Sequence, residues 1–188
     1  MGEPPLSDAE LEAVTIGPLE ELNAPIELAE YDPAWPELFN VESKRVRSAI
    51  GDRALRIEHT GSTSVPGLAA KPIIDMLLVV GDSDDEASYV PALERAGYVL
   101  RIREPEWHGH RLFRRADPAV NLHVHPDGCP EIDRILAFRD HLRSNDADRR
   151  LYEQAKRALA RKRWKYVQRY ADAKTSVIEE ILSRAIMS

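Results

Sequence analysis

The sequence predicts an α+β fold, in which a mixed β-sheet has helices on one side and a helical C-terminal cap. The strand-like and helical segments of the 188 residues do not alternate strictly, as they would in a doubly wound parallel sheet. Residues 72–80 are almost all apolar, which is typical of a strand buried on both faces. From Glu131 onward the patterns are helical and no strand is apparent.

The composition indicates a globular protein of one domain, or of one domain with an appendage. Apolar residues make up 43% and charged residues 31%. The 26 Lys and Arg against 32 Asp and Glu give a net charge of −6, which argues against a nucleic-acid partner. The single cysteine, Cys129, excludes a disulfide framework and a Cys-rich metal cluster and fits a reducing compartment. No apolar run approaches the roughly 18 residues of a membrane span, so we expect a cytoplasmic protein without a membrane partner.

The chain divides into an N-terminal arm with a short helix, residues 1–25, and a main domain, residues 26–188. Ser7 and Glu10 have the spacing of a capping box, and a Gly-Pro pair ends the helix that follows. Two interpretations of the arm stay open. It packs on the main domain or on a neighbouring molecule, or it is a frayed tail.

The first half of the main domain is expected to form a strand at 26–30, a helix at 33–50, strands at 54–60 and 72–80, and a helix at 82–96. Pro33 and Pro36 suit the first turn of a helix, and Gly51 suits its end. Residues 54–60 alternate, which places His59 on one face of a strand and Glu58 on the other. A turn-rich segment joins this strand to the apolar one.

The second half is expected to form strands at 98–103, 110–116 and 119–125, and helices at 131–143, 147–163 and 167–186. Turn-forming residues separate the three strands, so they are expected to pair as hairpins.

Asp75 is the most informative residue, because it interrupts an apolar strand. A buried charge costs several kcal/mol unless it is paired, hydrogen-bonded or bound to metal. Two explanations of Asp75 therefore stay open. It has a functional role, or it has a structural one near the start of the strand, where it caps a loop or pairs with an arginine. About a dozen residues earlier stand Gly61, Ser62, Thr63 and Ser64, whose backbone N–H groups and hydroxyls can cradle a phosphate. The pairing of this turn with an in-strand carboxylate predicts an anion site.

Histidine and basic residues supply the remaining candidates. Asn121, His123 and His125 share one face of a strand. His123 is the better functional candidate, whereas His125 is expected on a solvated face. His59 can line the same pocket, and His108 and His110 are expected to be loop residues near it.

Lys71 precedes the Asp75 strand, and Arg111, Phe113 and Arg115 share one strand face with Arg114 on the other. We expect Lys71 and Arg111 to neutralise the charge of a bound anion.

Four segments carry a resemblance to a known family: residues 31–36 (YDPAWP), 57–75 (IEHTGSTSVPGLAAKPIID), 121–124 (NLHV) and 138–143 (FRDHLR). Together they resemble the GrpB family, over about residues 26–186. The resemblance implies a nucleotidyltransferase-like fold, in which the Gly-Ser turn holds a triphosphate and paired carboxylates hold two divalent metals. Some GrpB-type domains are fused to dephospho-coenzyme A kinase, which hints at nucleotide-related metabolism.

The sequence departs from that pattern two residues after Asp75, where Leu77 replaces the second carboxylate. His123 can take the position of the third metal-binding carboxylate of that pattern. The fold analogy implies Mg²⁺ or Mn²⁺, whereas a ligand set of Asp75, His123 and His59 suits Zn²⁺ or Ni²⁺. Without metal, Asp75 and His123 would form an acid–base pair.

These observations lead to three hypotheses. The first is a protein that binds a nucleotide or another phosphorylated small molecule and can transfer a nucleotidyl group with a divalent metal. The second is a catalytically inactive version of the fold that acts as a binding or interaction module, with a protein partner or as a homodimer. The third is a metal-dependent enzyme that acts on an anionic, non-nucleotide substrate.

Overall fold

A five-stranded mixed sheet forms the centre of the computed structural model, which describes residues 5–22 and 24–185. The strands are β1 (Arg56–Thr60), β2 (Ile74–Val80), β3 (Val99–Glu104), β4 (His110–Arg115) and β5 (Val120–Pro126). Their order in the sheet is β1-β2-β5-β4-β3, and β2 and β5 are parallel while the other neighbours are antiparallel. The predicted α+β class and mixed sheet are confirmed, and so are the two hairpins.

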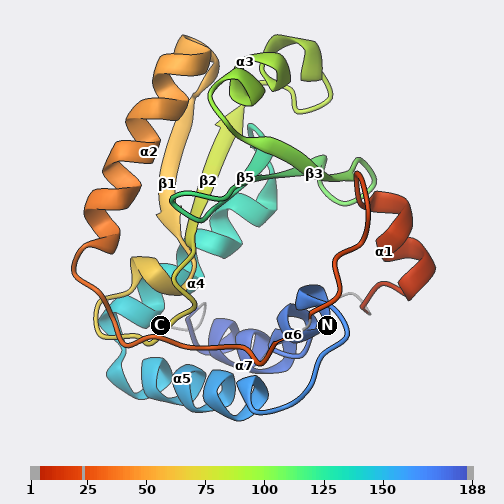
Figure 1. Ribbon diagram of the computed structural model, residues 1–188. Coiled ribbons are helices and arrows are strands. Elements are labelled where there is room, and N and C mark those ends of the chain that lie inside the picture. The colour runs from red at the N-terminus through yellow and green to blue at the C-terminus, as the bar shows by residue number, and fades with distance from the viewer. Residues whose placement is uncertain (1–4, 23, 186–188) are drawn as a thin grey trace.

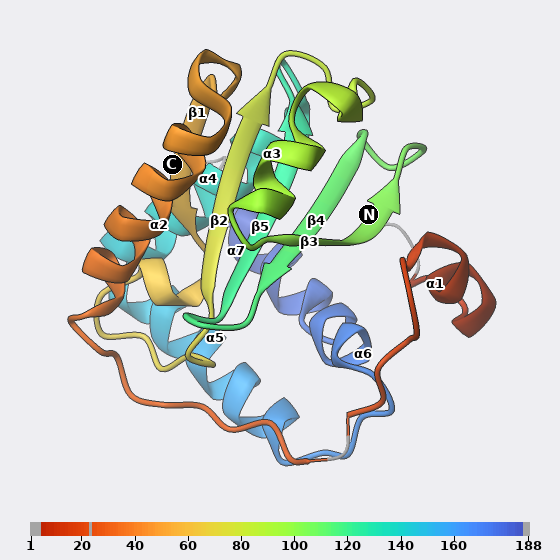
Figure 2. The same cartoon turned by 45° about the horizontal axis from the view of Figure 1, so that its top comes forward.

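The helices are α1 (Asp8–Val14), α2 (Trp35–Ile50), α3 (Val90–Arg95), α4 (Pro130–Ser144), α5 (Asp146–Ala160), α6 (Val167–Asp172) and α7 (Thr175–Ala185). The prediction of helices on one side holds for α2 and α3 (Figure 1). The C-terminal helices form the predicted cap, and α5, α6 and α7 lie at the end of the sheet where β2 begins (Figures 1 and 2). Its first helix, α4, covers the other face of the sheet. None of the helices in the described part of the chain has the length and apolar character needed to span a membrane.

Strand β2 is buried on both faces, as its apolar run predicts. Met76 and Leu78 join the core under α2 and α3. Leu77 and Val79 point the other way, where they pack with Ile132 and other residues of α4. Each side of this strand is therefore covered by a different helical layer.

The N-terminal arm packs on the main domain, which is one of the two interpretations left open by the sequence. Helix α1 begins with the predicted capping box. Thr15 then forms an antiparallel bridge with Ile102 of the edge strand β3, while Asp8 pairs with Lys165 and Arg169. The arm thus links the free edge of the sheet to the C-terminal helices (Figure 1).

Three predicted elements differ from the structure. The segment 26–30 has only a single bridge, between Ala29 and Ala70, instead of a strand. The helix expected at 82–96 is confined to α3, because an Asp82 side chain bonded to the Asp84 N–H forms a turn before it. The helix expected at 167–186 is interrupted after α6, where the backbone N–H of Lys174 bonds only three residues back.

Candidate anion-binding site

The turn after β1 shapes the candidate site. Gly61 leaves the strand with a φ of +62°, a conformation that favours glycine, and the 3₁₀ turn Ser62–Ser64 follows. The hydroxyl of Ser64 donates to the carbonyl of Gly61 at 2.6 Å. Because Ser64 is buried and bonded in this way, the structure places it in the scaffold of the turn and not on the pocket surface.

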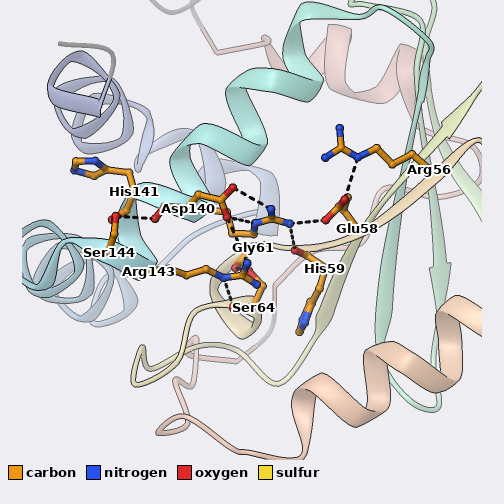
Figure 3. Close-up of polar contacts among 10 residues, drawn as sticks. Arg56, Glu58, His59, Gly61, Ser64, Asp140, His141, Arg143 and Ser144 are labelled. Carbon is orange, nitrogen blue, oxygen red and sulfur yellow. Dashed lines mark hydrogen bonds and ion pairs between the residues drawn. The ribbon is translucent and has the colours of Figure 1, made fainter. Parts of the chain in front are cut away.

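Two arginines of α4 hold this turn (Figure 3). Arg139 donates to the carbonyl of His59 at 3.0 Å and to the carboxylate of Glu58 at 2.8 Å. Arg143 donates from Nε to the carbonyl of Ser64 at 3.0 Å. These charge-assisted bonds fix the end of β1 and its turn against α4. The residues of the turn that face the pocket are therefore held in a defined position.

Asp75 lies beside the turn, in a row of residues that crosses four strands. The register pairs Arg114 with Asn121, Asn121 with Asp75, and Asp75 with Thr60. Asn121 Nδ2 donates to Asp75 Oδ1 at 2.9 Å. The structure therefore brings Asp75 to the Gly-Ser turn, as the sequence analysis expected, and Gly61 has no side chain in the space that its carboxylate occupies.

Three lysines surround the same point. Lys71, Lys156 and Lys174 line a small pocket of about 60 Å³ together with Ser62 and Asp75. Lys156, on α5, donates from Nζ to the hydroxyl of Ser62 at 2.9 Å. The ammonium groups come from three separate segments of the chain, so the fold itself assembles them around the end of the turn.

Because these three amines are buried, their protonated, charged forms are energetically costly. Desolvation lowers the pKa of Lys156 to about 7 and the pKa of Lys174 to about 8, and it also lowers the pKa of Lys71. Asp75 acts in the opposite direction on all three lysines, because a carboxylate favours the protonated amine. Glu153 acts in the same way on Lys156, and Asp172 on Lys174, but among the described residues that line the pocket one carboxylate faces three amines. An additional anion there would gain favourable charge interactions.

His59 does not join Asp75, contrary to the expected metal set. It pairs with Met76 in the sheet, so its side chain lies on the α2 face. There the ring stacks on Phe39 with centroids 4.8 Å apart, and its Nε2 lies 3.1 Å from the Thr63 hydroxyl. Burial lowers the pKa of His59 to about 4, so the ring is neutral at pH 7.

The residues present do not fit a divalent metal. Within residues 5–22 and 24–185, no three His, Cys, Asp or Glu side chains are grouped as a metal site would require. Leu77, which replaces the second carboxylate, is fully buried under α4. The three lysines beside Asp75 would also repel a cation. The chemistry of this pocket is that of an anion site.

Arg111 is not brought to this pocket, which corrects its expected role. It lies on the α3 face, only 3% exposed, and its guanidinium forms ion pairs with Asp84 at 2.7 Å and Glu86 at 2.6 Å. Strand alternation placed Arg114 on the opposite face, and Arg114 is the arginine that shares a row with Asn121. The predicted alternation of side chains along this strand is confirmed, but the prediction that Arg111 neutralises the bound anion is wrong.

Three histidines, two of them buried, form a cluster on the Asp75 face of the sheet: His110, His123 and His125. His110 Nε2 lies 3.0 Å from His123 Nδ1, and the rings of His110 and His125 stack with centroids 4.9 Å apart. His110 and His125 are 5% and 1% exposed, so the expectation of loop and solvent positions for them is wrong. His123 is in the row next to that of Asp75, opposite Leu77.

Lys156 and Lys174 did not emerge from the sequence as site residues. For Lys156 a signal exists, because Tyr152, Lys156 and Ala160 are spaced by four residues and are all buried on α5. A lysine within such an apolar stripe needs a polar partner, as a carboxylate in a strand does. For Lys174 the sequence shows no comparable signal, because the position of this residue depends on the break between α6 and α7.

Comparisons with known proteins find similar chains over most of this length. The sequence model of the family described as "GrpB protein" matches residues 25–184. The UPF0157 protein BH1888 of Halalkalibacterium halodurans is 59% identical over 181 residues, which are 96% of this chain and 93% of that protein. The crystal structure of the conserved protein GrpB from Enterococcus faecalis matches with a TM-score of 0.75 and 35% identity, covering 86% of this chain and 98% of that one.

A more distant similarity concerns a larger protein. The protein named dephospho-CoA kinase of Mycolicibacterium paratuberculosis is 32% identical over 162 residues. The match covers 72% of this chain but 40% of that protein, so the similarity is to part of it.

Proposed function

For this chain, which belongs to the GrpB family, we propose that it binds a nucleotide or another phosphorylated small molecule by its phosphoryl group. The observation that carries this proposal is the convergence of Lys71, Lys156 and Lys174 on the Ser62 end of the turn. Phosphate oxygens accept hydrogen bonds from ammonium and hydroxyl groups, and residues with both kinds of donor line the pocket.

The size of the pocket limits what it can enclose. Its volume of about 60 Å³ is roughly that of two water molecules in the liquid, at ~30 Å³ each. Pockets that enclose a drug-sized ligand measure about 300–1,000 Å³. We therefore assign the pocket to one phosphoryl group, with the rest of the ligand lying outside it.

The similarity to a protein named dephospho-CoA kinase is a weak hint that the ligand is related to nucleotides. The proposal is limited to binding and does not include metal-dependent nucleotidyl transfer. The buried Leu77 favours the second candidate function, a catalytically inactive binding module of the same fold. Both candidates keep the expected cytoplasmic location, because the thiol of Cys129 is free and suits a reducing compartment.

Calorimetry with pyrophosphate, ATP and adenosine, in the presence of a chelator, tests the proposal. We expect heat from pyrophosphate and ATP without metal, and none from adenosine. Lys156→Met removes a donor of the pocket and should weaken pyrophosphate binding at least tenfold. The matched control is Lys162→Met, at an exposed position outside the pocket, which should bind as the wild type does. Adenosine binding as tightly as ATP, or no binding of either phosphate compound, would refute the proposal.

A further inference from the structure

A chain of three hydrogen-bonding side chains crosses the sheet on the face that carries Asp75. Glu104 Oε2, at the end of β3, lies 2.6 Å from His110 Nδ1 on β4. His110 Nε2 lies 3.0 Å from His123 Nδ1 on β5. Both distances are those of hydrogen bonds, so the carboxylate, the first ring and the second ring are connected in series.

When Glu104 is ionised, this series determines which nitrogen of each ring carries a proton. Burial raises the pKa of Glu104, but its ionised carboxylate only accepts hydrogen bonds, so His110 then donates to it from Nδ1. The other nitrogen of a neutral His110 is then an acceptor, and His123 must donate to it from Nδ1. His123 Nε2 is left as an unprotonated acceptor, as in a histidine that serves as a general base.

The surroundings keep both rings neutral and fixed. Burial lowers the pKa of His110 and of His123 to about 3. The Trp107 ring packs edge-on against His110 with centroids 5.2 Å apart, and His125 stacks on its face. His110 is thus held between two aromatic rings, and a buried polar series of this kind requires every member to be satisfied.

His123 lies beside the lining of the anion pocket without being part of it. It is two residues from Asn121 on the same strand face, and Asn121 pairs with Asp75 and lines the pocket with it. Burial lowers the pKa of His123, and the Asp75 carboxylate opposes this shift in part. Unlike its partner His110, which is 5% exposed, His123 is only partly buried.

We propose that His123 accepts a proton, at Nε2, from a hydroxyl group of the molecule whose phosphoryl group binds at the lysine pocket, or from a water beside it. The O–H bond breaks, its electron pair stays on the oxygen, and an N–H bond forms on His123. Burial disfavours the resulting positive charge, and the carboxylates of Asp75 and of Glu104, the latter through His110, stabilise it. Glu104 and His110 are positioning residues, and no metal is required. This inference rests on the proposed function, since the bound molecule presents the hydroxyl to His123.

The test is NMR of the full chain with ¹⁵N-labelled histidine at pH 7. We expect the His123 Nε2 resonance at the position of an unprotonated nitrogen, and we expect pyrophosphate to shift it. His141, which is bonded to Asp148 outside the pocket, is the control that should not shift. In His110→Phe, His123 should lose its preference for the Nδ1–H form. Glu104→Ala should have the same effect and serves if the first variant does not fold.

The outcomes separate this inference from the proposed function. A His123 ring that carries its proton on Nε2 in the wild type would overturn the inference. So would pyrophosphate binding, seen by calorimetry, that leaves the His123 resonances unchanged, and in that case phosphate binding itself would stand. If pyrophosphate does not bind at all, both proposals fail.

Discussion

The carboxylate of Asp75 fills the space in which a side chain of Gly61 would begin. A Cβ atom built on Gly61 would lie 2.2 Å from Asp75 Oδ2, which is far inside a normal contact distance. The glycine of the turn and the aspartate of the strand are therefore linked by close packing, although thirteen residues lie between them in the chain. This contact places the carboxylate against the turn and beside the pocket.

Gly61→Ala should destabilise the protein much more than Gly67→Ala. Both glycines have positive φ, but a Cβ at Gly67 would meet nothing within 4 Å. A positive φ costs an L-residue about 1–2 kcal/mol, and overpacking adds about 1–3 kcal/mol at Gly61. Chemical denaturation measures the difference. In a double-mutant cycle, Asp75→Ala should recover part of the loss in Gly61→Ala, and fully additive effects would contradict the contact.

Lys156→Met should raise the free energy of unfolding at pH 7 by about 1–3 kcal/mol, because it removes a buried amine that folding deprives of water. Lys156 is 2% exposed, and its pKa falls from 10.5 in the unfolded chain to about 7.

Between pH 7 and 10.5 the unfolded chain binds more protons, so the Lys156 contribution makes the wild type more stable as pH rises. The advantage of the variant should therefore shrink toward pH 10. Denaturation curves at pH 7, 8.5 and 10 measure this, and an advantage that grows with pH would contradict it.

Sulfate binding should weaken by at least tenfold between pH 6 and pH 9. Lys156 and Lys174, with pKa values near 7 and 8, lose their protons over this range, while the charge of sulfate stays constant. A bound anion favours the protonated amines, so binding should take up protons. Calorimetry in buffers of different ionisation enthalpy measures this uptake. Affinity that does not change with pH would indicate that these two amines do not contact the anion.

Leu77→Asp should destabilise the fold instead of creating a metal site. The Leu77 side chain is fully buried and packs with Ile132 and Leu136 of α4, so a carboxylate there would be an unpaired buried charge. We expect a loss of about 3–5 kcal/mol, compared with less than about 1.5 kcal/mol for Leu77→Met. Denaturation curves and a Mn²⁺ titration measure both effects. A stable variant that binds Mn²⁺ would show that the position is open to the pocket.

Strand alternation carries much of what the sequence predicts of this site. It places Asn121 and His123 on one face and separates Arg114 from Arg111, and the structure agrees. Alternation does not say which face meets the pocket, so it does not decide between Arg111 and Arg114.

The lysines show a second limit of predicting the site from the sequence. Lys156 and Lys174 reach the turn only because the C-terminal helices pack at one end of the sheet, where Lys156 also bonds to the carbonyl of Ala69. Contacts between segments nearly a hundred residues apart leave no local pattern in the sequence. The two hairpins and the capping box, by contrast, depend on residues near each other in the sequence, and the structure confirms them.

Removal of residues 1–22 should promote self-association of the chain. In the full chain, the Ile16 N–H donates to the Arg101 carbonyl at 2.8 Å, next to the bridge between Thr15 and Ile102, so the arm covers part of the β3 edge. An uncovered edge strand can pair with the edge of a second molecule. Light scattering after size-exclusion chromatography should show a higher mass than for the full chain. Asp8→Asn is the control, because it breaks the pairs with Lys165 and Arg169 but keeps the bridge. A truncated chain of unchanged association state would show that the arm does not protect this edge.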